Sequence, residues 1–271
     1  ARGREAPRRA RRGRVTRATR VVLPPLLAAA VGLALWEGAA RGLAIPAYLL
    51  PPPSAVARAL VSEASVLAAA TATTAAAALA GFVASAVLGV AFGFLLASSR
   101  TIERGLYPYA VILQTVPIVA IAPLLVLWCG VGSRAVAASA FIVSVFPVIT
   151  SSLAGVRAVD PSLRALFALY RASRFQVLVK LELPGAAPQI ATGLRVACGL
   201  AVIGAIVGEF VAGFSEGSPG LGILVMTSYR QLRTDLLFAA VGCSSLLGMA
   251  MLGAVSLVSH GLLRRWCAPA R

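Results

Sequence analysis

Long apolar runs, separated by short charged segments, constrain the fold of this chain more than any other feature. A run of about 20 apolar residues is long enough to cross the hydrocarbon core of a bilayer as a helix. Apolar residues make up 59% of the 271 residues and charged residues only 13%, which is too little polar surface for a soluble protein of this size. The sequence therefore predicts an all-α integral membrane protein with about six transmembrane helices, at roughly 21–43, 65–98, 107–129, 134–156, 191–213 and 236–262.

The basic residues are distributed unevenly around these predicted spans. If both ends of the chain lie in the cytoplasm, 20 of the 25 Lys and Arg residues fall on the cytoplasmic side and 5 on the outer side. Cytoplasmic segments of membrane proteins are enriched in Lys and Arg. We therefore expect a multi-pass protein with cytoplasmic N- and C-termini. The formal net charge is +16, and we expect the basic residues that produce it to contact membrane lipids and not nucleic acid.

The first 20 residues carry nine arginines in a low-complexity stretch, which predicts a disordered cytoplasmic tail at 1–20. A basic start followed by an apolar run is also typical of a secretory signal peptide, and paired arginines are typical of twin-arginine export. However, the apolar run is as long as a full span and more spans follow it, which favours a first transmembrane helix. We expect a membrane domain at 21–265 and a C-terminal tail at 266–271.

Residues 157–190 have the pattern of two short helices joined by a turn. Asp160 is a favourable N-cap and Pro161 occupies the first helical position, while Pro184 is expected to end the second helix. Apolar residues at helical spacing, together with the basic residues at 164, 171, 174 and 180, make this segment amphipathic and cationic. The pattern indicates either a docking surface at the cytoplasmic face or a solvated loop held by anionic lipid headgroups.

Several polar or helix-breaking residues lie inside the predicted spans. Gln114 and Thr115 stand beside Pro117, and Pro123 follows; we expect this bent segment to line a translocation path, with a structural kink as the alternative. Glu209 is expected in a cavity or at the membrane interface, because a lone carboxylate is costly in hydrocarbon. Pairs of glycines four residues apart, which are typical of closely packed membrane helices, occur in two spans (Gly89 and Gly93; Gly204 and Gly208).

Residues typical of soluble enzyme chemistry are sparse. The single histidine is His260, the four cysteines show no C-x-x-C spacing, and the sequence has no G-x-x-x-x-G-K-[ST] motif for ATP. We therefore expect no catalytic residues, no metal site and no cofactor bound by this chain. An ion-coupled secondary transporter and an integral membrane enzyme stay open as alternatives. Only Glu209 and Glu37 are candidates for ion coupling, and no polar groups converge on a catalytic site.

The central segment resembles the cytoplasmic loop of permease subunits of ABC importers, which carry E-A-A-x-x-x-G, nine further residues and I-x-L-P. Leu181-Glu182-Leu183-Pro184 stands at the I-x-L-P position, Ala165-Leu166-Phe167 replaces E-A-A, and Arg171 replaces the glycine. Residues 171–175 are similar to the G-A-S-R-W variant of permeases for nitrate, sulfonates, taurine and pyrimidine or riboflavin precursors. Further blocks that resemble this subgroup lie at 114–132, 149–161, 204–210 and 220–225.

This resemblance implies a type I (MetI-like) permease fold with a cytoplasmic coupling-helix loop, in a bacterial plasma (inner) membrane. It also implies a dimer of permease subunits, usually identical, two cytoplasmic ATPases that bind ATP, and a periplasmic or lipid-anchored substrate-binding protein that delivers a small solute. Residues implied in coupling to the ATPase are Leu166, Tyr170, Arg171, Ala172, Ser173, Arg174, Phe175, Leu181 and Pro184; those expected along the translocation path are Gln114, Thr115, Pro117 and Glu209.

The replacement of the glycine by Arg171 leaves two interpretations. The turn at this position has ordinary helical geometry, or it is left-handed and costs about 1 kcal/mol with a non-glycine residue. In the second case, a charge pair between Arg171 and the ATPase is expected to offset the strain.

Overall fold

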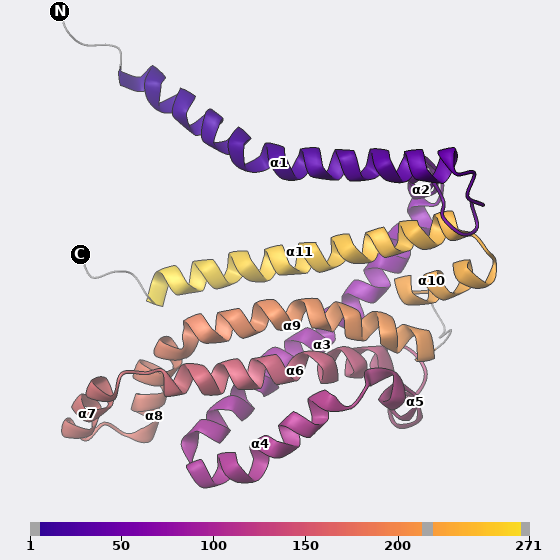
Figure 1. Ribbon diagram of the computed structural model, residues 1–271. Coiled ribbons are helices and arrows are strands. Elements are labelled where there is room, and N and C mark those ends of the chain that lie inside the picture. Colours follow the sequence, from indigo (N-terminus) through magenta and orange to yellow (C-terminus); the bar gives the residue numbers. More distant parts are fainter. Residues whose placement is uncertain (1–5, 213–218, 267–271) are drawn as a thin grey trace, which may run out of the picture.

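The computed structural model describes residues 6–212 and 219–266, and every regular element within these ranges is a helix (Figure 1). Five helices contain a segment long and apolar enough to cross a bilayer, and a bent pair of shorter helices makes a sixth. The prediction of about six transmembrane helices is therefore confirmed. The five are α1 (Ala6–Gly42), α3 (Ala64–Ser98), α6 (Ser133–Arg157), α9 (Leu183–Ala212) and α11 (Thr234–Trp266).

Helix α6 is the centre of the bundle and packs along α3 and along α9. Small residues make both contacts close. A Cβ atom added at Gly93 of α3 would lie 2.5 Å from the Cβ of Ser152, and one at Gly204 of α9 would lie 2.8 Å from the carbonyl oxygen of Ser139. A side chain larger than hydrogen does not fit at such distances, so the close helix approach predicted from the paired glycines is confirmed.

The predicted third span, at 107–129, is not a single bent helix. Helix α4 (Arg100–Thr115) and helix α5 (Ile118–Cys129) meet at an angle of 101°. Val116 is extended between them, with ψ 124°, because a residue that precedes proline avoids helical geometry. Pro117 then stands as the N-cap of α5. The proline at 117 therefore breaks the span, which is a larger effect than the kink expected from the sequence.

The segment before α9 also differs from the prediction, since Pro184 does not end a helix. Helix α8 (Arg174–Val177), a π-helical turn η1 (Leu178–Glu182) and α9 form one continuous helical segment, Arg174–Ala212. The π turn shifts the hydrogen bonding by one residue, and the N–H of Leu183 donates to the carbonyl of Leu178. A local change of this kind accommodates a proline within a helix.

The first helix also changes one sequence-based expectation. Residues 6–20, predicted to be disordered, form the first part of α1, because Ala and Arg are strong helix formers; residues 1–5 lie outside the described residues. Further along α1, Glu37 and Arg41 form an ion pair at 2.6 Å. Ser54 lies inside α2 (Pro53–Ser62) and donates its N–H and hydroxyl to Glu37.

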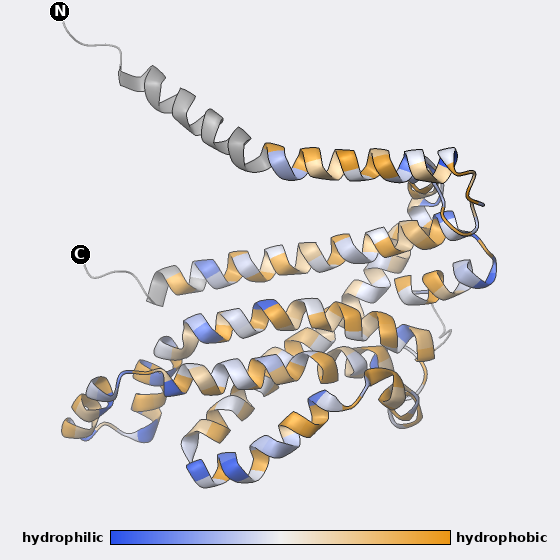
Figure 2. Ribbon diagram, viewed as in Figure 1, coloured by the Kyte–Doolittle hydropathy of each residue, from blue (hydrophilic) through white to orange (hydrophobic). Residues whose placement is uncertain are grey.

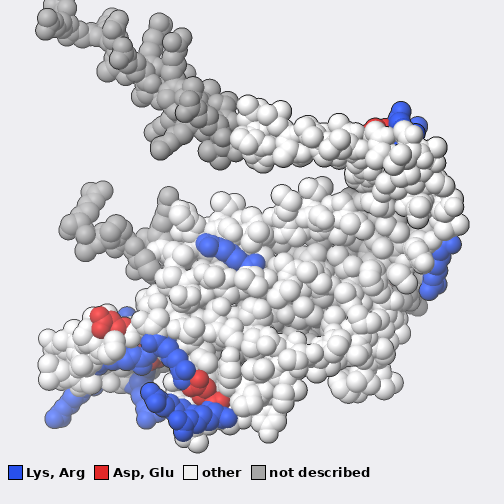
Figure 3. All heavy atoms as spheres, viewed as in Figure 1, with Lys and Arg blue, Asp and Glu red and all other residues white. Residues whose placement is uncertain are grey.

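The helices are arranged so that polar segments lie at the two ends of the bundle (Figure 2). One end carries the turn between α3 and α4 together with α7 (Pro161–Leu169) and α8. The other end carries α2, α5 and α10 (Leu221–Arg230). Basic side chains gather on the end that carries α7 and α8 (Figure 3). The division of the chain into tails and a membrane domain stays a prediction.

Candidate functional site

The loop between α6 and α9 begins with a capped helix, as the sequence predicts. The Asp160 side chain accepts hydrogen bonds from the hydroxyl and the N–H of Ser162, at 2.6 and 2.8 Å. These two bonds, the hydroxyl first, hold the pKa of the Asp160 carboxyl below its usual range. Pro161 occupies the first helical position, where no N–H is needed. The cap therefore sets where α7 starts.

Helix α7 ends in a turn that contains Arg171 in the left-handed region, with φ 51°. The N–H of Arg171 donates to Ala168 at 3.0 Å, and the N–H of Ala172 donates to Phe167 at 3.0 Å. This pair of bonds is the Schellman motif, whose left-handed position is usually glycine. The interpretation of ordinary helical geometry at Arg171 is therefore wrong. The turn also gives a physical reason why the E-A-A-x-x-x-G motif has glycine here.

The next helix is held by a cap that the sequence analysis missed. The Ser173 hydroxyl accepts from the N–H of Gln176 at 3.3 Å, and the Gln176 side chain accepts from the N–H of Ser173 at 2.9 Å. This reciprocal capping box orients α8 after the left-handed turn. Its signal is present in the sequence, because Ser followed three residues later by Gln is the spacing of a capping box.

The tip of the loop exposes large apolar side chains. Leu169, Tyr170 and Phe175 are 79%, 78% and 72% exposed, and Leu166 and Arg174 are exposed beside them. We refer to these five residues as the loop surface. Arg171 and Ser173 are also exposed, and Ala172 is half-buried. Exposed apolar patches on a rigid scaffold are typical of protein interaction sites.

Two of the predicted coupling residues, Leu181 and Pro184, lie away from the tip of the loop. Leu181 is buried, with 7% of its area exposed, and Pro184 is half-buried at the start of α9. Both lie where η1 passes into α9 and the chain returns towards the membrane helices, and their role in coupling stays a prediction. Leu169 belongs to the surface but was missed, because helical spacing alone does not show which face of a short helix is covered.

An ion pair joins α7 to η1 at the base of the loop, beside the membrane helices, and we call this region the root of the loop. Arg164 of α7 contacts Glu182 of η1 at 2.8 Å and donates to the carbonyl of Val156 in α6 at 2.7 Å. Arg164 and Glu182 lie 18 positions apart in the sequence, which alone does not bring them together. Arg157, the last residue of α6, forms a second ion pair with Glu103 of α4. The first set of contacts therefore ties the loop to α6, and the second ties α6 to α4.

The predicted path residues lie at the break between α4 and α5. Gln114, Thr115 and Pro117 are all exposed. The Thr115 hydroxyl donates to the carbonyl of Ile112 at 2.8 Å, which satisfies it within its own helix. The amide of Gln114 is available to a solute or to water. Whether these residues line a path stays a prediction.

Glu209 does not fit the predicted cavity or interface. Its side chain is buried, accepting from the Thr74 hydroxyl at 2.7 Å and from the Gly222 N–H at 2.6 Å. The Thr74 oxygen in turn accepts from the N–H of Leu221 at 2.8 Å. The carboxylate therefore joins α3, α9 and the start of α10, and it is used in helix packing. The sequence identified a residue that needs partners but not which partners it has.

Comparisons with known proteins identify the class of this protein. The sequence profile of the family described as "binding-protein-dependent transport system inner membrane component" matches residues 87–266. The chain belongs to this family. It is a multi-pass membrane protein and a transmembrane permease subunit of an ABC importer.

Individual relatives agree with this assignment. The chain is 36% identical over 220 residues to a probable ABC transporter permease protein of Haemophilus influenzae, covering 81% of this chain and 88% of the relative. It is 32% identical over 243 residues to the formylaminopyrimidine transport permease protein ThiX of Halalkalibacterium halodurans, covering 89% and 95%. Its fold matches a chain of the inward-facing MetNI methionine ABC transporter with a TM-score of 0.63, at 16% identity, over 74% of this chain and 97% of that one. The MetI-like permease fold is therefore confirmed.

Proposed function

We propose that the loop surface docks an ATPase subunit on the cytoplasmic side, and that this chain forms half of the path for a small solute. The observation that supports the docking proposal most strongly is the exposure of Tyr170 and Phe175 at the tip of a loop with well-defined caps. Aromatic side chains of this kind dominate the energetics of protein interfaces. The exposed Arg171 and Arg174 add positive charge for an acidic groove on the partner.

The contacts at the root of the loop support a mechanical role. Arg164 and Glu182 hold α7 against η1, and η1 continues directly into α9. A displacement of the loop by ATP-driven closure of the ATPases would therefore move α6 and α9, which pack along each other in the core. In this mechanism, two copies of the permease turn from inward-facing to outward-facing while ATP is bound only by the partner subunits.

The solute and the remaining partners are proposed from the family relationship. Relatives include a riboflavin transport permease of Chloroflexus aurantiacus and a taurine transport permease of Escherichia coli. We propose a solute of the sulfonate, nitrate, taurine or pyrimidine and riboflavin-precursor type. A periplasmic or lipid-anchored binding protein would deliver it at the end that carries α2 and α10. Gln114, Thr115 and Pro117 would line the path between two identical permease subunits.

The proposed orientation places the loop surface and the basic ends of α1 and α11 in the cytoplasm of a bacterial cell, with the spans in the inner membrane. It is supported by the distribution of Lys and Arg along the sequence. The test uses a chain whose native cysteines are replaced by alanine. An impermeant thiol reagent should label Arg230→Cys in sealed cells and should not label Leu169→Cys. Labelling of both variants to the same extent would overturn the orientation.

The docking proposal is tested by co-purification of the tagged permease with an ATPase encoded beside it. Phe175→Ala should lower retention of the ATPase by at least tenfold, because truncation of a buried interface anchor costs about 2 kcal/mol or more. Tyr229→Ala removes an aromatic that is 63% exposed on α10 at the other end and serves as the matched control. Equal retention in the parent, Phe175→Ala and Tyr229→Ala would contradict docking through the loop surface.

We do not propose an ion-coupled secondary transporter, the alternative from the sequence, because both of its candidate residues have other partners. Glu209 was its main candidate for ion coupling, and this side chain is buried with Thr74 and Gly222 as hydrogen-bond partners. Glu37 forms its ion pair with Arg41.

A further inference from the structure

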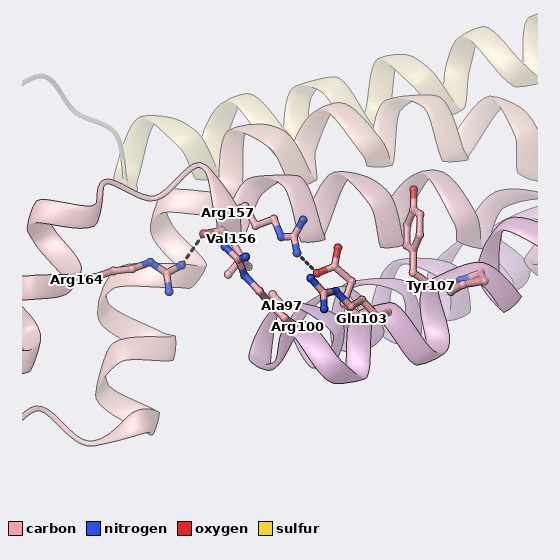
Figure 4. A pocket seen from close by; sticks show the side chains of 9 residues that line it. Ala97, Arg100, Glu103, Tyr107, Val156, Arg157 and Arg164 are labelled. Atoms are coloured by element: carbon pink, nitrogen blue, oxygen red, sulfur yellow. Dashed lines mark hydrogen bonds and ion pairs between the residues drawn. The ribbon is translucent and has the colours of Figure 1, made fainter.

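A polar pocket of about 870 Å³ lies at the end of the bundle that carries the loop (Figure 4). Its charged side chains are four arginines and one glutamate, from α4, α6 and α7. Arg157 is paired with Glu103, and Arg164 is paired with Glu182. Within the described residues, Arg100 and Arg104 have no acidic partner within ion-pair distance, so the pocket keeps an excess of positive charge. The lining residues are Ala97, Arg100, Glu103, Arg104, Tyr107, Pro108, Val156, Arg157 and Arg164.

An apolar cavity of about 530 Å³ lies beside the polar pocket, between α3, α4 and α6. It is lined on α3 by residues from Leu88 to Leu95 and on α6 by residues from Phe141 to Ile149. On α4 the two cavities overlap in sequence, since Tyr107 lines the polar pocket and Leu106 the apolar one. The Tyr107 ring lies 6.4 Å from that of Phe146. A positively charged pocket thus adjoins this apolar cavity, which we call the groove and which lies further along α4, towards the C-terminal end of that helix.

The described part of the chain has almost no acidic residue left to neutralise this pocket. Of the seven Asp and Glu residues in the described ranges, four form ion pairs, Asp160 caps α7 and Glu209 is buried in the helix packing. Asp235 remains, at the opposite end of the molecule. A second copy of this chain would have the same few uncommitted carboxylates. The positive charge of the pocket therefore suits an anion supplied by another molecule.

We propose that the pocket and the groove together bind one anionic phospholipid of the leaflet on the loop side. The phosphate of the headgroup would lie between Arg100 and Arg104, and an acyl chain would fill the groove beside Leu95 and Leu106. Basic pockets between transmembrane helices bind anionic headgroups in this way, and aromatic residues such as Tyr107 are enriched at the level of the headgroups. The identity of the leaflet that supplies the lipid depends on the proposed orientation. The proposal of a binding site does not depend on it.

The site would place a lipid against the root of the loop. Arg157 and Arg164 line the same pocket. The ion pair of Arg157 holds α4 against α6, and the ion pair of Arg164 holds η1 against α7. A bound phosphate would add to the attraction at this junction, so the lipid would stiffen the connection between the loop and the membrane helices. Lipid composition would then affect how firmly the loop is held, in addition to any effect of the bilayer as a solvent.

The test is lipid retention by the full-length permease, measured by native mass spectrometry after exchange into micelles with equal amounts of phosphatidylglycerol and phosphatidylcholine. The parent should retain one phosphatidylglycerol in preference to phosphatidylcholine. The double variant Arg100→Gln, Arg104→Gln should bind it about 25-fold more weakly, at about fivefold per arginine. Arg58→Gln with Arg230→Gln, at the other end, should leave retention unchanged. Arg100→Lys with Arg104→Lys should restore most of it, which separates lost charge from misfolding.

Other outcomes would overturn the proposal. Equal retention of both lipids would exclude a headgroup site. Displacement of phosphatidylglycerol by millimolar inorganic phosphate, with no dependence on acyl-chain length, would indicate a free-phosphate site instead. A changed mass of the oligomer in the arginine double variant, with lipid retention intact, would assign the surface to a second copy. The measurement needs neither ATPase nor solute, so it stays informative if the docking proposal fails.

Discussion

The buried carboxylate of Glu209 allows the most direct test of how this bundle is held together. Replacing Glu209 with alanine removes the acceptor for two donors, the Thr74 hydroxyl at 2.7 Å and the Gly222 N–H at 2.6 Å. A buried donor left without an acceptor costs about 1–3 kcal/mol. Against this, hydrogen bonds between membrane helices contribute only about 0.6 kcal/mol on average and about 1.7 kcal/mol at most.

The cost of an unpaired buried donor and the average contribution of a hydrogen bond between membrane helices predict different losses of stability. The geometry around Glu209 indicates which of the two applies. The Gly222 N–H lies in the first turn of α10, where it has no acceptor within the helix, and among the described residues it donates to Glu209. Water does not readily replace the carboxylate, because the side chain is buried. We therefore expect Glu209→Ala to destabilise the bundle by about 2–3 kcal/mol, which is a decrease of about 5–10 °C in melting temperature for a chain of this size.

Thermal unfolding in detergent, followed by tryptophan fluorescence and by the loss of the monodisperse peak in size-exclusion chromatography, measures this decrease. Glu209→Gln keeps the volume and one acceptor, so its melting temperature should fall between those of the parent and Glu209→Ala. Thr73→Val is the matched control, because the Thr73 hydroxyl is exposed and bonds only to its own helix. A Glu209→Ala protein that melts within 1 °C of the parent would refute the assignment of the carboxylate to helix packing (about 0.3–0.5 kcal/mol on the same scale).

Three further outcomes follow from the loop and the helix break. Arg171→Gly should stabilise the turn by about 1 kcal/mol, seen as slower hydrogen exchange of the following residues, since glycine adopts a positive φ without strain; faster exchange would contradict this. Gln114→Leu with Thr115→Leu should reduce solute uptake at unchanged expression and ATPase retention, and unchanged uptake kinetics would remove this segment from the path. The Asp160 cap should protect the amides of α7 from hydrogen exchange fully above about pH 4, and progressively less as the pH falls through the lowered pKa of that carboxyl. The protection of these amides in Asp160→Ala should lack this pH dependence.

The sequence by itself determined the class of fold and the family. Hydrophobic run length is a local property, and the bilayer thickness converts it directly into a number of spans. The cap at Asp160 and the spacing of the loop motif are also local, because each depends on neighbours within a few residues. For this reason the start of α7 was predicted correctly.

Only the tertiary structure decided what depends on contacts between distant residues. Glu209 was expected at a cavity or an interface, but Thr74 lies 135 positions earlier in the chain and satisfies it in the interior. Leu181 stands at a motif position for which coupling to the ATPase was expected. It is buried, and its burial depends on helices that lie outside the motif. The sharp break at Pro117 and the left-handed turn at Arg171 were two of several conformations that the local sequence permits. Local propensities leave such alternatives within a few kcal/mol of one another, and the packing of the whole bundle selects among them.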